Sequence, residues 1–182
     1  MAREIKGYLA NQFGFSETGM YILDNLIKPR IREIGIIIHD PFIECTKELD
    51  LNYLEKLDNY EGRKKYLEEF SRKVTPINNG LMQDSDCLLA ILDGGYVIDD
   101  GVASEIGYYA GIQRGPIFAL RSDFRLGENM AVLINPQVEG YIALSQGYLA
   151  SGKNSLEMWF EKINDWHKIL SSKLLKSQKI EE

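Results

Sequence analysis

The feature that most restricts the fold is an unbroken apolar run at residues 87–92. The run is short and lacks polar alternation, which is typical of a strand buried on both faces of a parallel sheet. Gly94 and Gly95 follow it, and small and apolar residues then recur at helical spacing over residues 101–111. A second apolar run occupies residues 116–120. The order strand, loop, helix, strand predicts a right-handed crossover unit, and therefore an α/β fold with an open parallel sheet.

The rest of the chain continues this pattern. With 182 residues and no Pro/Gly/Ser-rich linker, we expect a single domain that covers residues 1–182. Apolar periodicity predicts its other elements: strands at residues 4–10 and 33–39, a helix from Ser16 that ends at Pro29, one or two amphipathic helices within 47–73, a short helix within 75–86, and a C-terminal helix at about 155–175.

Composition narrows the range of partners. A formal net charge of -6 argues against nucleic acid or an anionic membrane as the main partner, and it is compatible with a small neutral ligand. Cys45 and Cys87 do not suggest a disulfide framework, and without a signal-like or membrane-spanning apolar segment the expected location is a reducing cytoplasm. His39 and His167 have no neighbours at metal-ligand spacing, so neither a metal nor another cofactor is expected.

The loop at residues 93–100 and the start of the next helix are the expected rim of a ligand pocket, because ligands bind at the carboxyl ends of strands in open α/β sheets. Glu105 and Asp99 lie there, and two carboxylates can do acid, base or nucleophilic work on a sugar. Acidic residues also stabilise helix N-termini, and spacing alone favours that role.

Aromatic side chains near the same edge have two possible roles. Tyr8 falls near the carboxyl end of the first strand, where its hydroxyl could reach the floor of the pocket or its ring could simply be half-buried. Phe13 and Phe42 are candidate apolar walls of the pocket, and core packing explains them equally well.

Several separated blocks stand out when they are taken together in their order and spacing. They are Leu92-Asp93-Gly94, Asp99-Asp100-Gly101-Val102-Ala103-Ser104-Glu105-Ile106-Gly107-Tyr108, Phe118-Ala119-Leu120-Arg121-Ser122-Asp123-Phe124-Arg125, the N-terminal strand with Tyr8, and Asn135-Pro136-Gln137-Val138-Glu139. This set of blocks resembles the nucleoside 2-deoxyribosyltransferases. The likeness extends to about Gly147 and leaves out the C-terminal helix.

The resemblance implies a flavodoxin-like sheet with helices on both faces, and transfer of a 2-deoxyribosyl group from one nucleobase to another. By this likeness, Glu105 is the nucleophile that holds the sugar covalently, the Tyr8 hydroxyl positions it, and Asp99 contacts the base and helps it to leave. Asn135 matches a residue that a neighbouring subunit contributes to the 5'-hydroxyl of the sugar, and Gln137 in the same block is a further candidate for substrate binding. The implied partners are 2'-deoxynucleosides and free nucleobases, in a homo-oligomer with shared active sites.

The sequence departs from the family at one position. The family often has a second aspartate on the helix before the central strand, and Asn78 stands there in this chain. An amide can hydrogen-bond a base but cannot donate an acid proton, so protonation of the base would rest on Asp99.

Two other functions remain open at this point. A deoxynucleoside monophosphate N-glycosidase would give the sugar to water, but it needs cationic or amide-rich contacts to phosphate, and the loop at residues 11–16 contains no Arg or Lys. A non-catalytic nucleotide-binding sensor on the same fold is the second alternative, because fold does not determine function.

Overall fold

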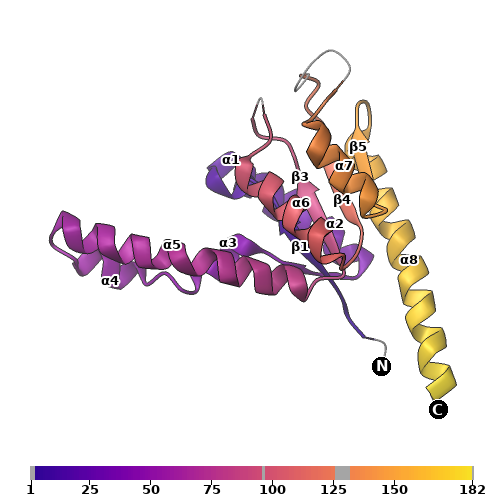
Figure 1. Cartoon of the computed structure of the whole chain (residues 1–182), viewed down its shortest axis with the longest axis horizontal. Coiled ribbons are helices and arrows are strands. Elements are labelled where there is room, and N and C mark those ends of the chain that lie inside the picture. Colours follow the sequence, from indigo (N-terminus) through magenta and orange to yellow (C-terminus); the bar gives the residue numbers. More distant parts are fainter. Residues whose placement is uncertain (1–2, 96, 126–131, 182) are drawn as a thin grey trace.

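The computed structural model describes residues 3–95, 97–125 and 132–181. Within these ranges, five strands form one parallel sheet in the order β2-β1-β3-β4-β5 (Figure 1). This is the flavodoxin-like order, and its switch point lies between β1 and β3. The expected fold class is confirmed. The strands are β1 (Ile5–Ala10), β2 (Ile36–His39), β3 (Cys87–Ile91), β4 (Ile117–Arg121) and β5 (Tyr148–Ser151).

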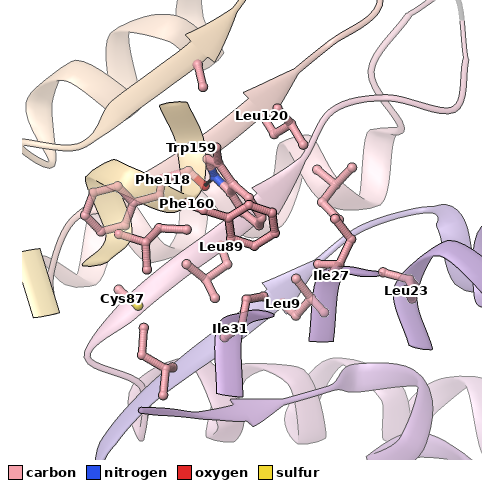
Figure 2. Close-up of a cluster of buried hydrophobic side chains, with 14 of the residues drawn as sticks. Leu9, Leu23, Ile27, Ile31, Cys87, Leu89, Phe118, Leu120, Trp159 and Phe160 are labelled. Carbon is pink, nitrogen blue, oxygen red and sulfur yellow. Dashed lines mark hydrogen bonds between the residues drawn. The ribbon is translucent and has the colours of Figure 1, made fainter. Parts of the chain in front are cut away.

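One face of the sheet is covered by α1 (Glu17–Ile22), η2 (Leu23–Ile27), α2 (Lys28–Ile34) and α8 (Ser155–Glu181). Figure 2 shows the apolar side chains that fill this layer. Trp159 of α8 is completely buried, and its indole nitrogen donates a hydrogen bond of 2.9 Å to the Phe118 carbonyl of β4. A buried indole needs such a partner, so this bond fixes α8 on the sheet.

The opposite face is covered by the C-terminal end of α5 (Tyr60–Gln83), by α6 (Asp100–Ile112) and by α7 (Pro136–Leu144). Tyr8 and Leu88 point to this face, whereas their chain neighbours Leu9 and Leu89 point to the other. This alternation follows from the two-residue period of a strand. Because both faces are covered, β3 is buried along its whole length, as its sequence predicted.

The first helical segment differs from its prediction. Pro29 does not end it, because α1, the π-helical turn η2 and α2 follow one another without a break and Pro29 lies in the first turn of α2. The π-helical turn η2 is wider than an α-helical turn and comes just before Pro29, which has no N–H to donate. The chain therefore continues as a helix through the proline. Gly35, at φ 100°, then ends α2 in the left-handed conformation, so β2 begins at Ile36 and not at residue 33.

The second difference concerns the charged middle of the chain. The predicted short helix at 75–86 is the C-terminal part of α5, a helix of 24 residues that runs through Pro76. Asn78 and Asn79 therefore lie inside α5, and Asn59 caps its start by accepting a hydrogen bond from the Gly62 amide. Packing of Met82 against the sheet holds this end of α5 in place despite the bond lost at Pro76. With α4 (Leu51–Lys56), the other end of α5 extends away from the sheet (Figure 1).

Four elements were not predicted: η1 (Phe13–Phe15), α3 (Pro41–Thr46), α7 and β5. Asp40 caps α3 by accepting a hydrogen bond from the Phe42 amide, and Pro41 occupies the first turn, where it is well tolerated. The C-terminal helix starts at Ser155 as predicted and continues to Glu181. Across the described ranges, no helix is long and apolar enough to cross a membrane.

Candidate active site

The site is centred on a contact between Tyr8 and Glu105. Tyr8 lies near the carboxyl end of β1 with 0% of its surface exposed, and its hydroxyl donates a hydrogen bond of 2.5 Å to Glu105 Oε1. Glu105 lies in the second turn of α6, which follows β3, the neighbour of β1 in the sheet. The crossover connection therefore places the carboxylate over the switch point, where such folds bind ligands.

Asn78 joins the same carboxylate from α5. Its Nδ2 group lies 3.3 Å from Glu105 Oε1, and its Oδ1 atom lies 3.4 Å from the Sγ atom of Cys45 on α3. Four elements, β1, α3, α5 and α6, thus bring side chains to one point.

Asp99 has both of the roles that its sequence position suggested. Its Oδ1 atom caps α6 by accepting a hydrogen bond of 3.0 Å from the Val102 amide. The same side chain lines the cavity that contains Glu105, so capping does not remove it from the site. The negative charge of Asp99 also raises the pKa of the neighbouring Glu105 carboxyl.

Burial dominates the electrostatics of Glu105. It raises the pKa of the carboxyl to about 7, and the negative charge of Asp99 acts in the same direction, while the hydrogen bond from Tyr8 opposes both. The pKa of Tyr8 is raised well above its usual value by burial and by the nearby Glu105 charge. Tyr8 therefore keeps its proton and acts as a hydrogen-bond donor, and Glu105 changes charge near neutral pH.

The Glu105 cavity has a volume of about 390 Å³, within the usual range for small-molecule sites. Its polar lining consists of Asn11, Cys45, Thr46, Asn78, Asp99 and Glu105. Its larger apolar lining residues are Phe15, Pro41, Phe42, Leu49, Phe70, Val74 and Val102.

Of the two aromatic residues expected as walls, the structure places Phe42 in the cavity and Phe13 outside it. Phe13 packs against the core on the other face of the sheet, at the start of the η1 turn. Phe15 lines the cavity in its place and meets Phe42 edge to face, with ring centroids 4.9 Å apart. The sequence does not show which of two phenylalanines in one tight turn points inward.

Asn135 and Gln137 lie in a second cavity of about 510 Å³, between the N-terminal ends of α6 and α7. Asn135 caps α7, with its Oδ1 atom accepting a hydrogen bond of 2.9 Å from the backbone N–H of Gln137. Neither residue lines the Glu105 cavity of the same chain. The structure thus brings Tyr8, Asn78, Asp99 and Phe42 to Glu105, and leaves Asn135 and Gln137 elsewhere.

Sequence reasoning missed several residues that shape the site. Asn11 is buried and ties the turn after β1 together, donating to the Leu9 carbonyl and accepting from the Gly14 amide. Asp40 forms a buried ion pair of 2.6 Å with Lys28 while it caps α3, the helix that carries Cys45. The pair Asp40-Pro41 after a strand is a helix-start signal that could have revealed α3.

Asp93 connects the loops beside the site. It accepts hydrogen bonds from the Ser122 amide and hydroxyl and from the Asp123 amide, which joins the loop after β3 to the loop after β4. In the described residues, no group of three or more His, Cys, Asp and Glu side chains is arranged to hold a metal ion.

A doubly wound parallel sheet with a partly buried carboxylate beside a cavity at its switch point defines a class of α/β fold whose members bind small molecules at that edge of the sheet. The comparisons with known proteins identify the family within that class. The nucleoside 2-deoxyribosyltransferase family model matches residues 8–151, and the chain belongs to this family. The resemblance inferred from the sequence blocks is confirmed, and membership indicates a nucleoside 2-deoxyribosyltransferase-like function.

Two solved structures are similar to the chain. A 2-desoxiribosyltransferase from Leishmania mexicana is 14% identical with a TM-score of 0.48, and the match covers 74% of this chain and 85% of that one. A 2-deoxyribosyltransferase from Bacillus psychrosaccharolyticus is 16% identical with a TM-score of 0.49, covering 85% and 90% of the two chains. No curated protein matches the chain.

Proposed function

We propose that this protein transfers a 2-deoxyribosyl group from one nucleobase to another, with Glu105 as the nucleophile. The observation that carries the proposal is the Glu105 carboxylate itself, mostly buried, bonded to Tyr8 and Asn78, and facing a largely apolar cavity. A carboxylate in such a place can stabilise an oxocarbenium-like transition state and then capture it.

In the first half of the reaction, a Glu105 oxygen attacks the anomeric carbon of a 2'-deoxynucleoside. The new bond joins that carbon to the carboxylate, the carbon–nitrogen bond to the base breaks, and the electron pair leaves with the base nitrogen. In the second half, a nitrogen of the incoming base attacks the same carbon, and the bond to Glu105 breaks. The carboxylate is regenerated, so the enzyme is unchanged overall.

Asp99 is the proposed proton carrier for the base. It lines the same cavity as Glu105, whereas the amide of Asn78 has no acidic proton to give. A proton delivered by Asp99 neutralises the departing base, and the incoming base returns a proton when it bonds to the sugar.

The cavity lining favours nucleosides over nucleotides. Among the described residues that line it there is no lysine or arginine, the side chains that pair most strongly with a phosphate group. Its aromatic walls, Phe15, Phe42 and Phe70, suit the faces of a nucleobase.

The proposed enzyme is a homo-oligomer with shared active sites. Asn135 and Gln137 lie outside the Glu105 cavity of their own chain, which supports a role for them at a neighbouring subunit's substrate. The two buried free thiols, Cys45 and Cys87, suit a reducing compartment such as the cytoplasm.

Incubation with deoxyinosine and free adenine tests the function. We expect deoxyadenosine to form, and mass spectrometry of protein quenched with deoxyinosine alone should find one deoxyribosyl group on the peptide that contains Glu105. Glu105→Ala should reduce exchange by roughly a thousandfold or more without unfolding the protein. Glu161→Gln, an exposed carboxylate change on α8, is the matched control and should keep full activity.

Other outcomes would contradict the proposal in distinguishable ways. Free deoxyribose without a new nucleoside would indicate a hydrolase. Binding of nucleosides without turnover, with this purine pair and with a pyrimidine pair, would indicate a sensor module.

A further inference from the structure

Asn78 uses both ends of its amide within the protein. Its Nδ2 group donates to Glu105 Oε1 at 3.3 Å, and its Oδ1 atom accepts from the Cys45 thiol at 3.4 Å. Asn78 therefore connects α3 to α6 through two successive hydrogen bonds.

The orientation of the amide follows from the chemistry of its neighbours. An ionised carboxylate has no proton to give, so the Asn78 group facing Glu105 must be the NH₂ donor. The amide oxygen then faces Cys45, whose thiol can donate. Burial and the charge of Glu105 raise the pKa of Cys45, which keeps this thiol protonated.

Tyr8 and Asn78 both bond to the same oxygen of Glu105. Tyr8 approaches Oε1 from β1 and Asn78 approaches it from α5. Among the residues that the structure describes, none donates a hydrogen bond to Oε2. Two donors from different elements restrict rotation of the carboxylate and leave one oxygen available.

We infer that Asn78 is a positioning residue for the nucleophile: with Tyr8 it holds Oε1 of Glu105, so that Oε2 forms the bond to the sugar, and Cys45 fixes the amide of Asn78. The inference rests on the proposed transferase function. It changes the role expected for Asn78 from a contact to the base into a contact to the catalytic carboxylate. The base is then recognised by the apolar walls and by Asp99.

The pKa of Glu105 depends on the charged and hydrogen-bonding groups around it, so a change in this pKa can report the loss of the Asn78 donor. Tyr8 of β1 and Cys45 of α3 stay protonated and neutral, and Asp99 at the start of α6 adds negative charge. Asn78 is neutral but favours the charged form of Glu105 by donating to it. Removal of this donor should therefore raise the pKa of Glu105 above its present value of about 7.

Kinetics of the variants provide the first test. Asn78→Ala should lower kcat by roughly ten- to hundredfold, the effect of one hydrogen bond to a charged group, with KM for the base changed less than about twofold. Cys45→Ala should lower kcat by roughly two- to tenfold, and Cys45→Ser, which keeps a donor, should restore most of it. Asn79→Ala makes the same change one residue along α5 and should leave both constants unaltered. A raised KM with unchanged kcat in Asn78→Ala would identify a base contact and overturn the inference.

A titration provides a second test that needs no turnover. The carboxyl carbon of Glu105, identified in ¹³C-labelled protein by its loss in Glu105→Gln, should titrate at higher pH in Asn78→Ala than in wild type. An unchanged midpoint overturns the inference even if the wild type exchanges bases. If the wild type exchanges no bases, the proposed function is wrong whatever the midpoint shows, so the two failures are separate.

Discussion

The Tyr8 hydroxyl and Glu105 Oε1 lie 2.5 Å apart although 97 residues separate them in the chain. The contact exists because β1 and β3 are adjacent parallel strands, and α6 returns over them immediately after the loop that follows β3. It couples the protonation of the carboxylate to the position of a buried phenol.

Tyr8→Phe should keep the fold and impair catalysis. The ring remains in the core, but Glu105 loses the hydrogen bond that lowers its pKa, so the acid limb of the pH–rate profile should move to higher pH. We expect the rate at neutral pH to fall by roughly ten- to hundredfold, the effect of one hydrogen bond to a charged group. Tyr109→Phe is the control, because that buried hydroxyl donates to the Ser85 carbonyl. A profile that moves equally in both variants would contradict the role of Tyr8.

Glu105→Gln should stabilise the protein at alkaline pH. The folded state raises the pKa of Glu105 from 4.5 to about 7, so it holds the proton more tightly than the unfolded chain does. The stabilising effect of protonated Glu105 is complete below pH 4.5 and is lost as pH rises through about 7. The loss amounts to at most about 3 kcal/mol, at roughly 1.4 kcal/mol per pKa unit.

Urea unfolding at pH 5 and pH 8 tests whether protonated Glu105 stabilises the folded protein. Relative to wild type, Glu105→Gln should gain more stability at pH 8 than at pH 5. Glu161→Gln, on exposed α8 surface, should show no such difference between the two pH values. Equal differences at both pH values for Glu105→Gln would mean that Glu105 is ionised normally in the folded state.

Phe15 and Phe13 should respond in opposite ways to truncation. Phe15 is 77% exposed and lines the Glu105 cavity, so Phe15→Ala should cost little stability and should raise KM for the base severalfold. Phe13 packs against the core, so Phe13→Ala should cost roughly 1–3 kcal/mol of unfolding free energy and leave KM nearly unchanged. Steady-state kinetics and urea titration of the two variants separate these effects. A normal KM in Phe15→Ala would exclude Phe15 from the base site.

Mixing two inactive variants tests whether subunits share sites. Asn135→Ala and Glu105→Ala should each be inactive or nearly so as homo-oligomers. If Asn135 serves the neighbouring subunit, dissociation and reassembly of the mixture should restore part of the wild-type rate, because some sites receive both native residues. A mixture that stays at the sum of the two separate rates would place Asn135 outside the shared site.

Local patterns were sufficient for much of the architecture. The apolar runs at residues 87–92 and 116–120 predicted two buried strands, and Asp99 before the small-residue helix predicted a helix start that the structure confirms. Prolines were less reliable, since Pro29 and Pro76 both lie within longer helical segments. A proline removes one hydrogen bond, and the packing of the helix against the sheet can outweigh that loss.

By itself, the sequence determined the order and kind of most elements, the family blocks, and the presence of Glu105 and Asp99 beside the switch point. Only the tertiary structure decided that Asn78 and Cys45 join Glu105, that Phe15 replaces Phe13 in the cavity, and that Asn135 lies apart from the carboxylate of its own chain. The physical reason is that propensities and caps act over a few residues, whereas contacts across 27 to 97 positions depend on how each helix is rotated and packed on the sheet.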